Sequence, residues 1–306
     1  MELDELPIKI DVKIDSADMR KAFNKLIDTI SSPFRWFATY KEPVKLAKAE
    51  VEAALIRVNA IGPLSESLGI SKEEAISMIL RSDQRDQYEK IRQQNNIEKI
   101  VQISTKMLPS SVNDLSVDED WTVAFFDQCK NISDEEMHTL WAKILAGEVA
   151  HPGTYSRRVL SFIKTLSRQE ADTITKFCSF LWKDSNVGFI HILMGNGTDF
   201  LENNGIQYTD LIELESLGIM RFDINTFISF DFKDELPPLL FYHGEPHYLY
   251  MANRELAPKF NILAMTSLGN CLAPIAGSVR NEKYYLESID EFKKNGFYIS
   301  DKPPRE

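Results

Sequence analysis

Apolar residues recur every three or four positions through most of the N-terminal half of the chain, which is the spacing of one face of an α-helix. We expect Ser16 to cap the first helix with its hydroxyl group. The apolar stripe of that helix consists of Met19, Phe23, Leu26, Ile27 and Ile30. A longer helix is predicted from Pro43 to the stop at Gly62-Pro63. Residues 1–15 alternate polar and apolar side chains, as in a strand or an extended arm.

Two further helices are expected between residues 71 and 108. The S-K-E-E run from Ser71 to Glu74 is a capping box, which predicts a short helix up to Leu80. The second helix, 81–108, is almost wholly polar in its first half. Its narrow apolar stripe consists of Tyr88, Ile91, Ile97, Ile100 and Val101. A helix of this kind either crosses solvent or packs along a thin seam against a partner helix.

The periodicity changes after residue 183. Residues 209–217 predict a helix that ends at Gly218 and continues into a strand, and 221–232 predict a hairpin. A second hairpin is expected about His243-Gly244-Glu245-Pro246. A strand over 259–266 and a last helix that ends before Gly296 complete the pattern. We therefore predict a mainly α protein with a small α+β, winged-helix-like C-terminal part.

A polar, acidic segment at 109–120 is the best candidate for a linker. With the change of periodicity, it divides the chain into three expected parts. These are an N-terminal helical region (1–108), a central helical domain (120–183) and the winged-helix-like region (184–306). A length of 306 residues is enough for more than one domain.

The net charge of −11 at pH 7 argues against binding to duplex DNA, which normally needs a basic face. The helix that would enter the groove carries Asp210, Glu213 and Glu215 and no basic residue. A groove between helices that binds a small nucleotide or a short single-stranded oligonucleotide stays open, with Arg85 and Arg92 as contacts. The sequence contains no phosphate-binding or dinucleotide-binding loop, so we predict no cofactor.

Three cysteines without a C-x-x-C motif fit free thiols in a reducing cytoplasm. The N-terminus lacks the features of a signal peptide, and no apolar run is long enough to span a membrane. We therefore expect a cytoplasmic protein. A peripheral position at the inner membrane is the alternative, because an aromatic and basic segment could lie on a membrane surface. Its residues are Phe34, Trp36, Phe37, Lys41 and Lys45. Burial of the same segment against other helices or another subunit is favoured.

Two histidines near the second hairpin, His243 and His247, are weak candidates for metal ligands. A zinc site normally has three or four protein ligands, and glycine and proline between the histidines indicate a turn. We therefore predict no metal site.

The segment from Asp120 to Ala171 carries a set of short motifs. They are Asp120-Trp121, S-D-E-E from Ser133, W-x-x-I-L-A-G-E from Trp141 to Glu148, Pro152-Gly153, and S-x-R from Ser156 to Arg158. With these motifs the chain resembles a bacterial family described as a domain of unknown function. Its central part is similar to the abortive-infection alpha group, which is found near phage-defence genes. The resemblance implies a bacterial protein in a defence setting, and it supplies no active site.

Glu148 is the most unusual residue of this segment. It lies on or beside an apolar helical stripe that contains Trp141, at a helix C-terminus where the macrodipole disfavours an anion. The favoured hypothesis is structural: Pro152-Gly153 turn the chain, and Arg157 or Arg158 returns to pair with the carboxylate. The alternative makes Glu148 a general acid or base beside His151 or Ser156. Trp121 and Trp141 are expected in the core.

Together these observations predict a non-enzymatic effector or regulatory protein of phage defence. It would self-associate as a homo-oligomer through its N-terminal helices, with a protein from the same operon as a further partner. One alternative is a pore-forming or membrane-perturbing effector gated by a nucleotide or an oligonucleotide. The other is a hydrolase or nuclease that uses Glu148.

Overall fold

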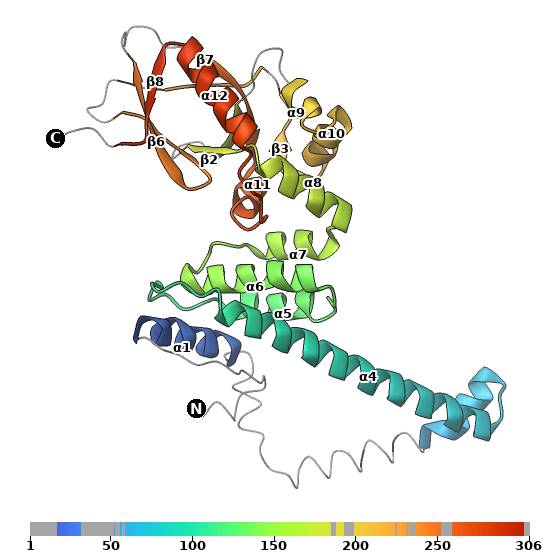
Figure 1. Ribbon diagram of the computed structural model, residues 1–306. Helices are drawn as coiled ribbons and strands as arrows, with labels where there is room; N and C mark the ends of the chain where they lie inside the picture. Colours follow the sequence, from blue (N-terminus) through green and yellow to red (C-terminus); the bar gives the residue numbers. More distant parts are fainter. Residues whose placement is uncertain are drawn as a thin grey trace. The chain divides into compact units, whose positions relative to one another are not determined.

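The computed structural model describes residues 17–31, 52, 56, 59–184, 188–192, 199–223, 225–230, 232, 237–251 and 259–302. The chain divides into two units, Met1–Lys164 and Thr165–Glu306, which we describe separately (Figure 1). The protein is mainly α with a small antiparallel β part, as predicted. The division lies elsewhere than the boundaries expected from the sequence, and the segment 109–120 belongs to the first unit. The winged-helix likeness stays a prediction.

Helix α6 (Glu135–Ala150) is the centre of the first unit. It packs against α1 (Ala17–Ser31) and α4 (Lys72–Thr105), and α5 (Glu119–Cys129) contacts the same two helices. Trp141 of α6 is fully buried, and Phe125 of α5 meets its ring edge-on at 5.4 Å between centroids. Helix α7 (Arg157–Thr165) follows, and residues 59–68 are also helical. Aromatic side chains of the motif-bearing segment 120–171 are therefore part of the core of the first unit.

The predicted first helix and its apolar face are confirmed. Phe23, Leu26 and Ile30 of α1 are buried, whereas Met19 lies at the exposed edge of the stripe. Because α1 packs on α5 and α6, its own unit covers this face. The apolar surface of α1 is therefore already used within the chain.

The two helices expected between residues 71 and 108 are one continuous helix, α4, and the prediction of a break was wrong. Ser71 caps it as expected, and its Oγ accepts the N–H of Glu74 at 3.1 Å. Residues 80 and 81 are leucine and arginine, both good helix formers, so nothing there stops the helix. Its 34 residues make it about 50 Å long. As Figure 1 shows, its N-terminal half extends beyond the helices that cover its C-terminal half.

The second unit is built on a sheet in which every described strand pair is antiparallel. The order along the sheet is β3-β7-β2-β1-β5-β6-β8, and β4 also pairs with β7. The strands are β1 (Trp182–Asp184), β2 (Gly188–Ile192), β3 (Met220–Arg221), β4 (Phe227–Ser229), β5 (Leu239–Tyr242), β6 (Glu245–Met251), β7 (Lys259–Met265) and β8 (Phe297–Ser300). The helices are α8 (Arg168–Cys178), α9 (Asp199–Asn203), α10 (Tyr208–Ser216), α11 (Ser267–Leu272) and α12 (Glu282–Lys294).

One predicted hairpin is confirmed and the other was wrong. β5 and β6 form a hairpin whose two turn residues, His243 and Gly244, have φ of 48° and 88°, as a type I′ turn requires. By contrast, β3 and β4 do not pair with each other, because both pair with β7. The sequence pattern predicted that these two strands pair with each other across a short turn. Instead, each forms its hydrogen bonds with the long strand β7.

An aromatic cluster joins β1, β5 and β6 to α12. The indole N–H of Trp182 donates to Ser288 Oγ at 3.2 Å, and the Trp182 ring lies 4.9 Å from Tyr242 and 5.2 Å from His247. His247 is only 4% exposed, and within the described structure its Nε2 atom has no hydrogen-bond partner. Burial lowers the pKa of His247; Glu245 and Asp301 act in the opposite direction, and Arg280 adds to the lowering.

This buried imidazole predicts acid sensitivity of the second unit. Because the folded-state pKa of His247 lies below its ordinary value of 6.5, the unfolded chain binds the proton more tightly. The stability that comes from neutral His247 is therefore present above that value and is lost as the pH falls below it. Replacing His247 with phenylalanine keeps the ring and removes the titration. We expect His247→Phe to lose less thermal stability than the wild type between pH 7 and pH 5, measured by circular dichroism. The exposed His151→Asn variant serves as control, and an equal loss in all three proteins would contradict the prediction.

Candidate functional site

The carboxylate of Glu148 holds the turn that follows α6. Its side chain is 2% exposed. Oε1 accepts the backbone N–H of Gly153 at 2.6 Å, and Oε2 accepts that of Tyr155 at 2.8 Å. Gly153 has a φ of 90°, which lets the chain reverse within a few residues and point these amides back at the helix end. The carboxylate at this helix C-terminus is therefore stabilised by the backbone amides of the turn, although the helix dipole disfavours it.

The expected arginine partner of Glu148 was wrong. Both carboxylate oxygens are engaged by backbone amides, and the ion pair of Arg157 is with Asp120, at 3.9 Å on the exposed surface. Arg158 is exposed, whereas Glu148 is buried. The physical reason is that the backbone N–H groups of the turn lie next to the carboxylate and bind it, so no side chain from α7 is needed as a partner. The clamp at the helix end exists, and its partners differ from those expected.

The two residues proposed as catalytic partners of Glu148 are at the surface, whereas Glu148 is buried. His151 and Ser156 are exposed, and Ser156 Oγ accepts the N–H of Val159 at 3.4 Å at the start of α7. Burial raises the pKa of Glu148, the amides of the turn act in the opposite direction, and nearby Asp118 adds to the rise. A carboxyl with a raised pKa is a feature of active sites and also of structural networks. Because each oxygen of Glu148 already accepts a backbone N–H, we favour the structural interpretation.

The turn also anchors α5. The indole N–H of Trp121 donates to the backbone oxygen of Tyr155 at 2.6 Å, and the ring of Trp121 stacks on Phe125 at 5.2 Å. Gly147, one position before Glu148, leaves room for the Tyr155 ring, because a Cβ there would lie 2.9 Å from it. The residues Gly147, Glu148, Pro152 and Gly153 of the motif region therefore surround one packed junction.

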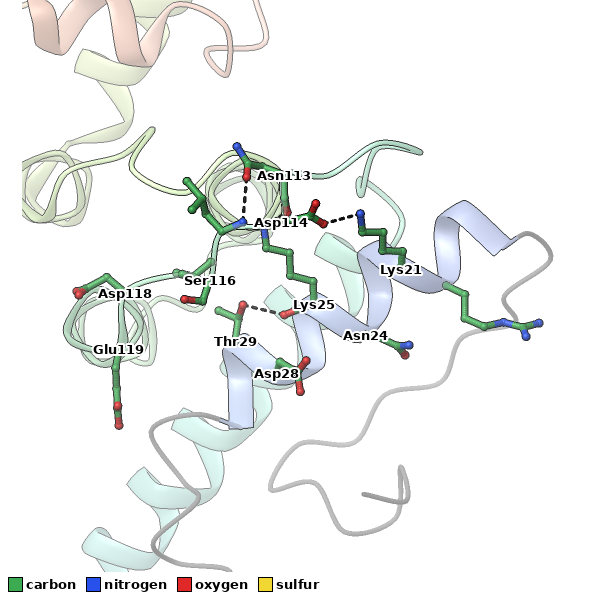
Figure 2. Close-up of a pocket in the computed structure, with 13 residues that line it drawn as sticks. Lys21, Asn24, Lys25, Asp28, Thr29, Asn113, Asp114, Ser116, Asp118 and Glu119 are labelled. Atoms are coloured by element: carbon green, nitrogen blue, oxygen red, sulfur yellow. Dashed lines mark hydrogen bonds and ion pairs between the residues drawn. The ribbon is translucent and has the colours of Figure 1, made fainter.

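A polar hollow lies beside this junction, between α1 and the segment before α5 (Figure 2). Its volume is about 910 Å³. It is lined by residues of α1, namely Arg20, Lys21, Asn24, Lys25, Asp28 and Thr29, and by residues 113–119. Residues 113–119, which form one wall of the hollow, lie within the segment 109–120 that was predicted to be a linker. The signal against a linker was Asp118, which caps α5 by accepting the N–H of Trp121 at 2.8 Å.

Two lysines of α1 hold the wall of the hollow. Lys25 Nζ donates to the backbone oxygen of Asn113 at 2.6 Å, and Lys21 pairs with Asp114 at 2.6 Å. Asn113 in turn donates its N–H to the oxygen of Ala150, the last residue of α6, at 2.8 Å. Partial burial lowers the pKa of Lys25, while Asp114 and Glu148 act in the opposite direction. Because Lys21, Lys25 and Asp118 are engaged, the hollow is best understood as a junction between α1 and the wall.

Two of the basic residues proposed as ligand contacts, Arg85 and Arg92, lie on the described helix α4. Arg92 donates to the oxygen of Asn131 at 3.1 Å and to Ser133 Oγ at 3.2 Å, so it fastens α4 to the loop before α6. Arg85 lies on the exposed part of α4, 3.8 Å from Asp86. The other predicted contacts, Phe34, Trp36, Phe37, Lys41 and Lys45, lie outside the described residues.

The structure also bears on the two histidines considered as metal ligands and on contact with a membrane. His243 is exposed in the β-hairpin turn, and His247 is buried in the aromatic cluster. In the part of the chain that the structure describes, no group of three histidine, cysteine or acidic side chains is placed to hold a metal ion. No helix among the described residues is both long enough and apolar enough to span a bilayer.

Comparison with known proteins identifies one family. The family model described as "Protein of unknown function (DUF2806)" matches residues 80–288, which include Glu148, the turn that binds it and strands β1 to β7 of the second unit. No curated protein and no solved structure matches the chain. Because α1 lies outside the match, the two lysines that hold the wall of the hollow are not part of the matched region.

The Glu148 junction yields a stability prediction. Glutamine keeps one acceptor but places an NH₂ group against the second amide, so one buried N–H of the turn loses its partner at a cost of roughly 1–3 kcal/mol. We expect Glu148→Gln to lower the thermal unfolding temperature. Arg158→Ala and the exposed Glu135→Gln should leave it nearly unchanged. A large decrease in the unfolding temperature of Arg158→Ala would support the arginine pairing predicted from the sequence. An unchanged unfolding temperature of Glu148→Gln would contradict the stabilising role of the amide hydrogen bonds.

Proposed function

The chain belongs to the DUF2806 family, and we propose that it acts by binding and not by catalysis, as a regulatory protein that self-associates through the N-terminal half of α4. The observation that carries the proposal is an apolar stripe left on the surface of this helix segment. Tyr88 is 70% and Ile91 71% exposed, and Leu80 and Ile76 are exposed as well.

These four side chains share one face of α4. At 3.6 residues per turn, Ile76, Leu80, Tyr88 and Ile91 fall within about 120° of each other around the helix axis. A stripe of this width is what a helix presents to a partner helix. Large apolar residues repeated along one exposed helix face indicate an interaction surface more strongly than single exposed ones.

The apolar residues predicted along α4 do not share one face, because at 3.6 residues per turn Ile100 lies about 180° around the axis from Ile91 and about 120° from Tyr88. Ile100 and Val101, in the C-terminal half of the helix, are buried, and α4 packs there on α6. Tyr88 and Ile91, in the N-terminal half, remain exposed. Full burial of a large apolar side chain contributes roughly 1.5–3 kcal/mol, so a few residues of this size provide a meaningful driving force for association.

Charge supports a second copy of the chain as the partner. Within residues 81–90 the three basic residues Arg81, Arg85 and Lys90 balance the three acids Asp83, Asp86 and Glu89. The whole chain carries −11, so two copies repel each other on average. Residues 76–91, which carry the four exposed apolar side chains, therefore have no net charge, which makes this part of α4 a favourable place for two copies to meet.

The geometry of Glu148 supports binding over chemistry, because the acid in the W-x-x-I-L-A-G-E motif already spends both oxygens on the backbone. We further propose phage defence as the biological setting, which rests on the resemblance to the abortive-infection alpha group. Plaque assays in a bacterial host that expresses the wild type or Glu148→Gln test both ideas. A folded Glu148→Gln protein that loses all protection would favour the hydrolase or nuclease alternative.

Self-association predicts a specific effect of the stripe. The wild type should be a dimer or larger assembly by native mass spectrometry and by light scattering after gel filtration. Replacing Tyr88 and Ile91 together with serine should shift it to a monomer without lowering the unfolding temperature of the rest of the unit. The matched control replaces Val279 and Leu286, two exposed apolar residues of the second unit, with serine. A monomeric wild type at cellular concentration, or a control that dissociates equally, would refute the proposal.

A further inference from the structure

The second unit contains a separate cavity on the sheet. It has a volume of about 430 Å³. Its floor is formed by one row of cross-strand neighbours, because Lys183 of β1 lies opposite Phe189 of β2 and opposite Phe241 of β5. On β1 the flanking residues Trp182 and Asp184 are buried, while Lys183 is exposed. Successive side chains of a strand alternate between its faces, so the cavity lies on the face opposite Trp182 and its aromatic cluster.

The walls of the cavity come from two other segments. Leu181 follows α8, and Ala273 and Pro274 follow α11. The loop after α11 is held in place, because Thr175 Oγ1 donates to the oxygen of Ala276 at 2.9 Å. Strand β2 is held as well, since Asn270 Oδ1 accepts the N–H of Phe189 at 2.6 Å. The cavity is therefore preformed by hydrogen bonds that do not depend on a ligand, which lowers the ordering cost of binding.

The chemistry of the lining selects one class of ligand. Phe189, Phe241, Leu181, Ala273 and Pro274 provide an apolar bed, and Lys183 supplies a cation whose Nζ lies 5.8 Å from the centre of the Phe189 ring. No acidic residue occurs among the described lining residues, although the whole chain is acidic. A largely apolar cavity of this size with few polar groups is typical of small-molecule sites.

We propose that this cavity binds a small aromatic carboxylic acid. The rings of Phe189 and Phe241 contact the aromatic body from the floor. The carboxylate pairs with Lys183, which lies between the two phenylalanines in the row. The exposed His243 at the hairpin turn borders the opening, where its Nε2 lies 3.3 Å from the oxygen of Ser179. This assignment is independent of association through α4, so the failure of either leaves the other standing.

The experiment compares 2-naphthoate with its neutral analogue 2-naphthamide on the full-length protein, by isothermal titration calorimetry and ligand-observed NMR. We expect saturable binding of naphthoate and weaker binding of naphthamide. Lys183→Gln should weaken naphthoate about tenfold, the effect of one charge-assisted contact, and leave naphthamide unchanged. Phe241→Leu should weaken both probes.

Lys302→Gln, an exposed lysine of the same unit, is the matched control and should change neither affinity. Because Lys183 is exposed, Lys183→Gln should fold normally, which its unfolding temperature verifies. Equal affinity for the two probes, no effect of Lys183→Gln, or no saturable binding of naphthoate would each overturn the proposal.

Discussion

The arrangement of the first unit depends on one buried carboxylate that binds the backbone of a turn. An unpaired charge inside a protein is very unfavourable, and so is a buried N–H without an acceptor. Glu148 and the amides of Gly153 and Tyr155 satisfy each other. In the resulting turn the oxygen of Tyr155 accepts the indole N–H of Trp121, and the oxygen of Ala150 accepts the N–H of Asn113. Helices α5 and α6 and the segment before α5 thus all meet where the chain reverses.

This arrangement separates stability from function in the chain. Motif residues that look chemically suggestive, an acid beside a tryptophan and a proline-glycine pair, are used to close a junction between helices. The two surfaces that we propose for interaction lie elsewhere: on α4, beyond the helices that cover its C-terminal half, and on the sheet face of the second unit that carries Lys183.

The sequence was a good guide wherever the determining interaction is local. The face of α1, the Ser71 cap and the hairpin about His243 depend on spacing, capping and turn chemistry within a few residues, and all three were predictable. It failed where the partners are backbone groups outside the periodic pattern, whether near or far along the chain. The amides that hold Glu148, the pairing of both β3 and β4 with β7, and the bond from Lys25 to Asn113 leave no periodic trace. The last of these turned an apparent linker into a wall of the first unit.

For helix α4, the sequence could not show which of its apolar residues are buried within the chain. Its apolar stripe is visible in the sequence, but periodicity cannot say whether the partner of a stripe is in the same chain. The residues that the sequence assigns to one stripe lie on different faces of α4: Ile100 and Val101 are buried, and Tyr88 and Ile91 face solvent. Selection for solubility alone would favour polar residues at the second pair. The exposed pair and the balanced charges around it, in an otherwise acidic chain, are the two observations that support the proposed contact with a second copy.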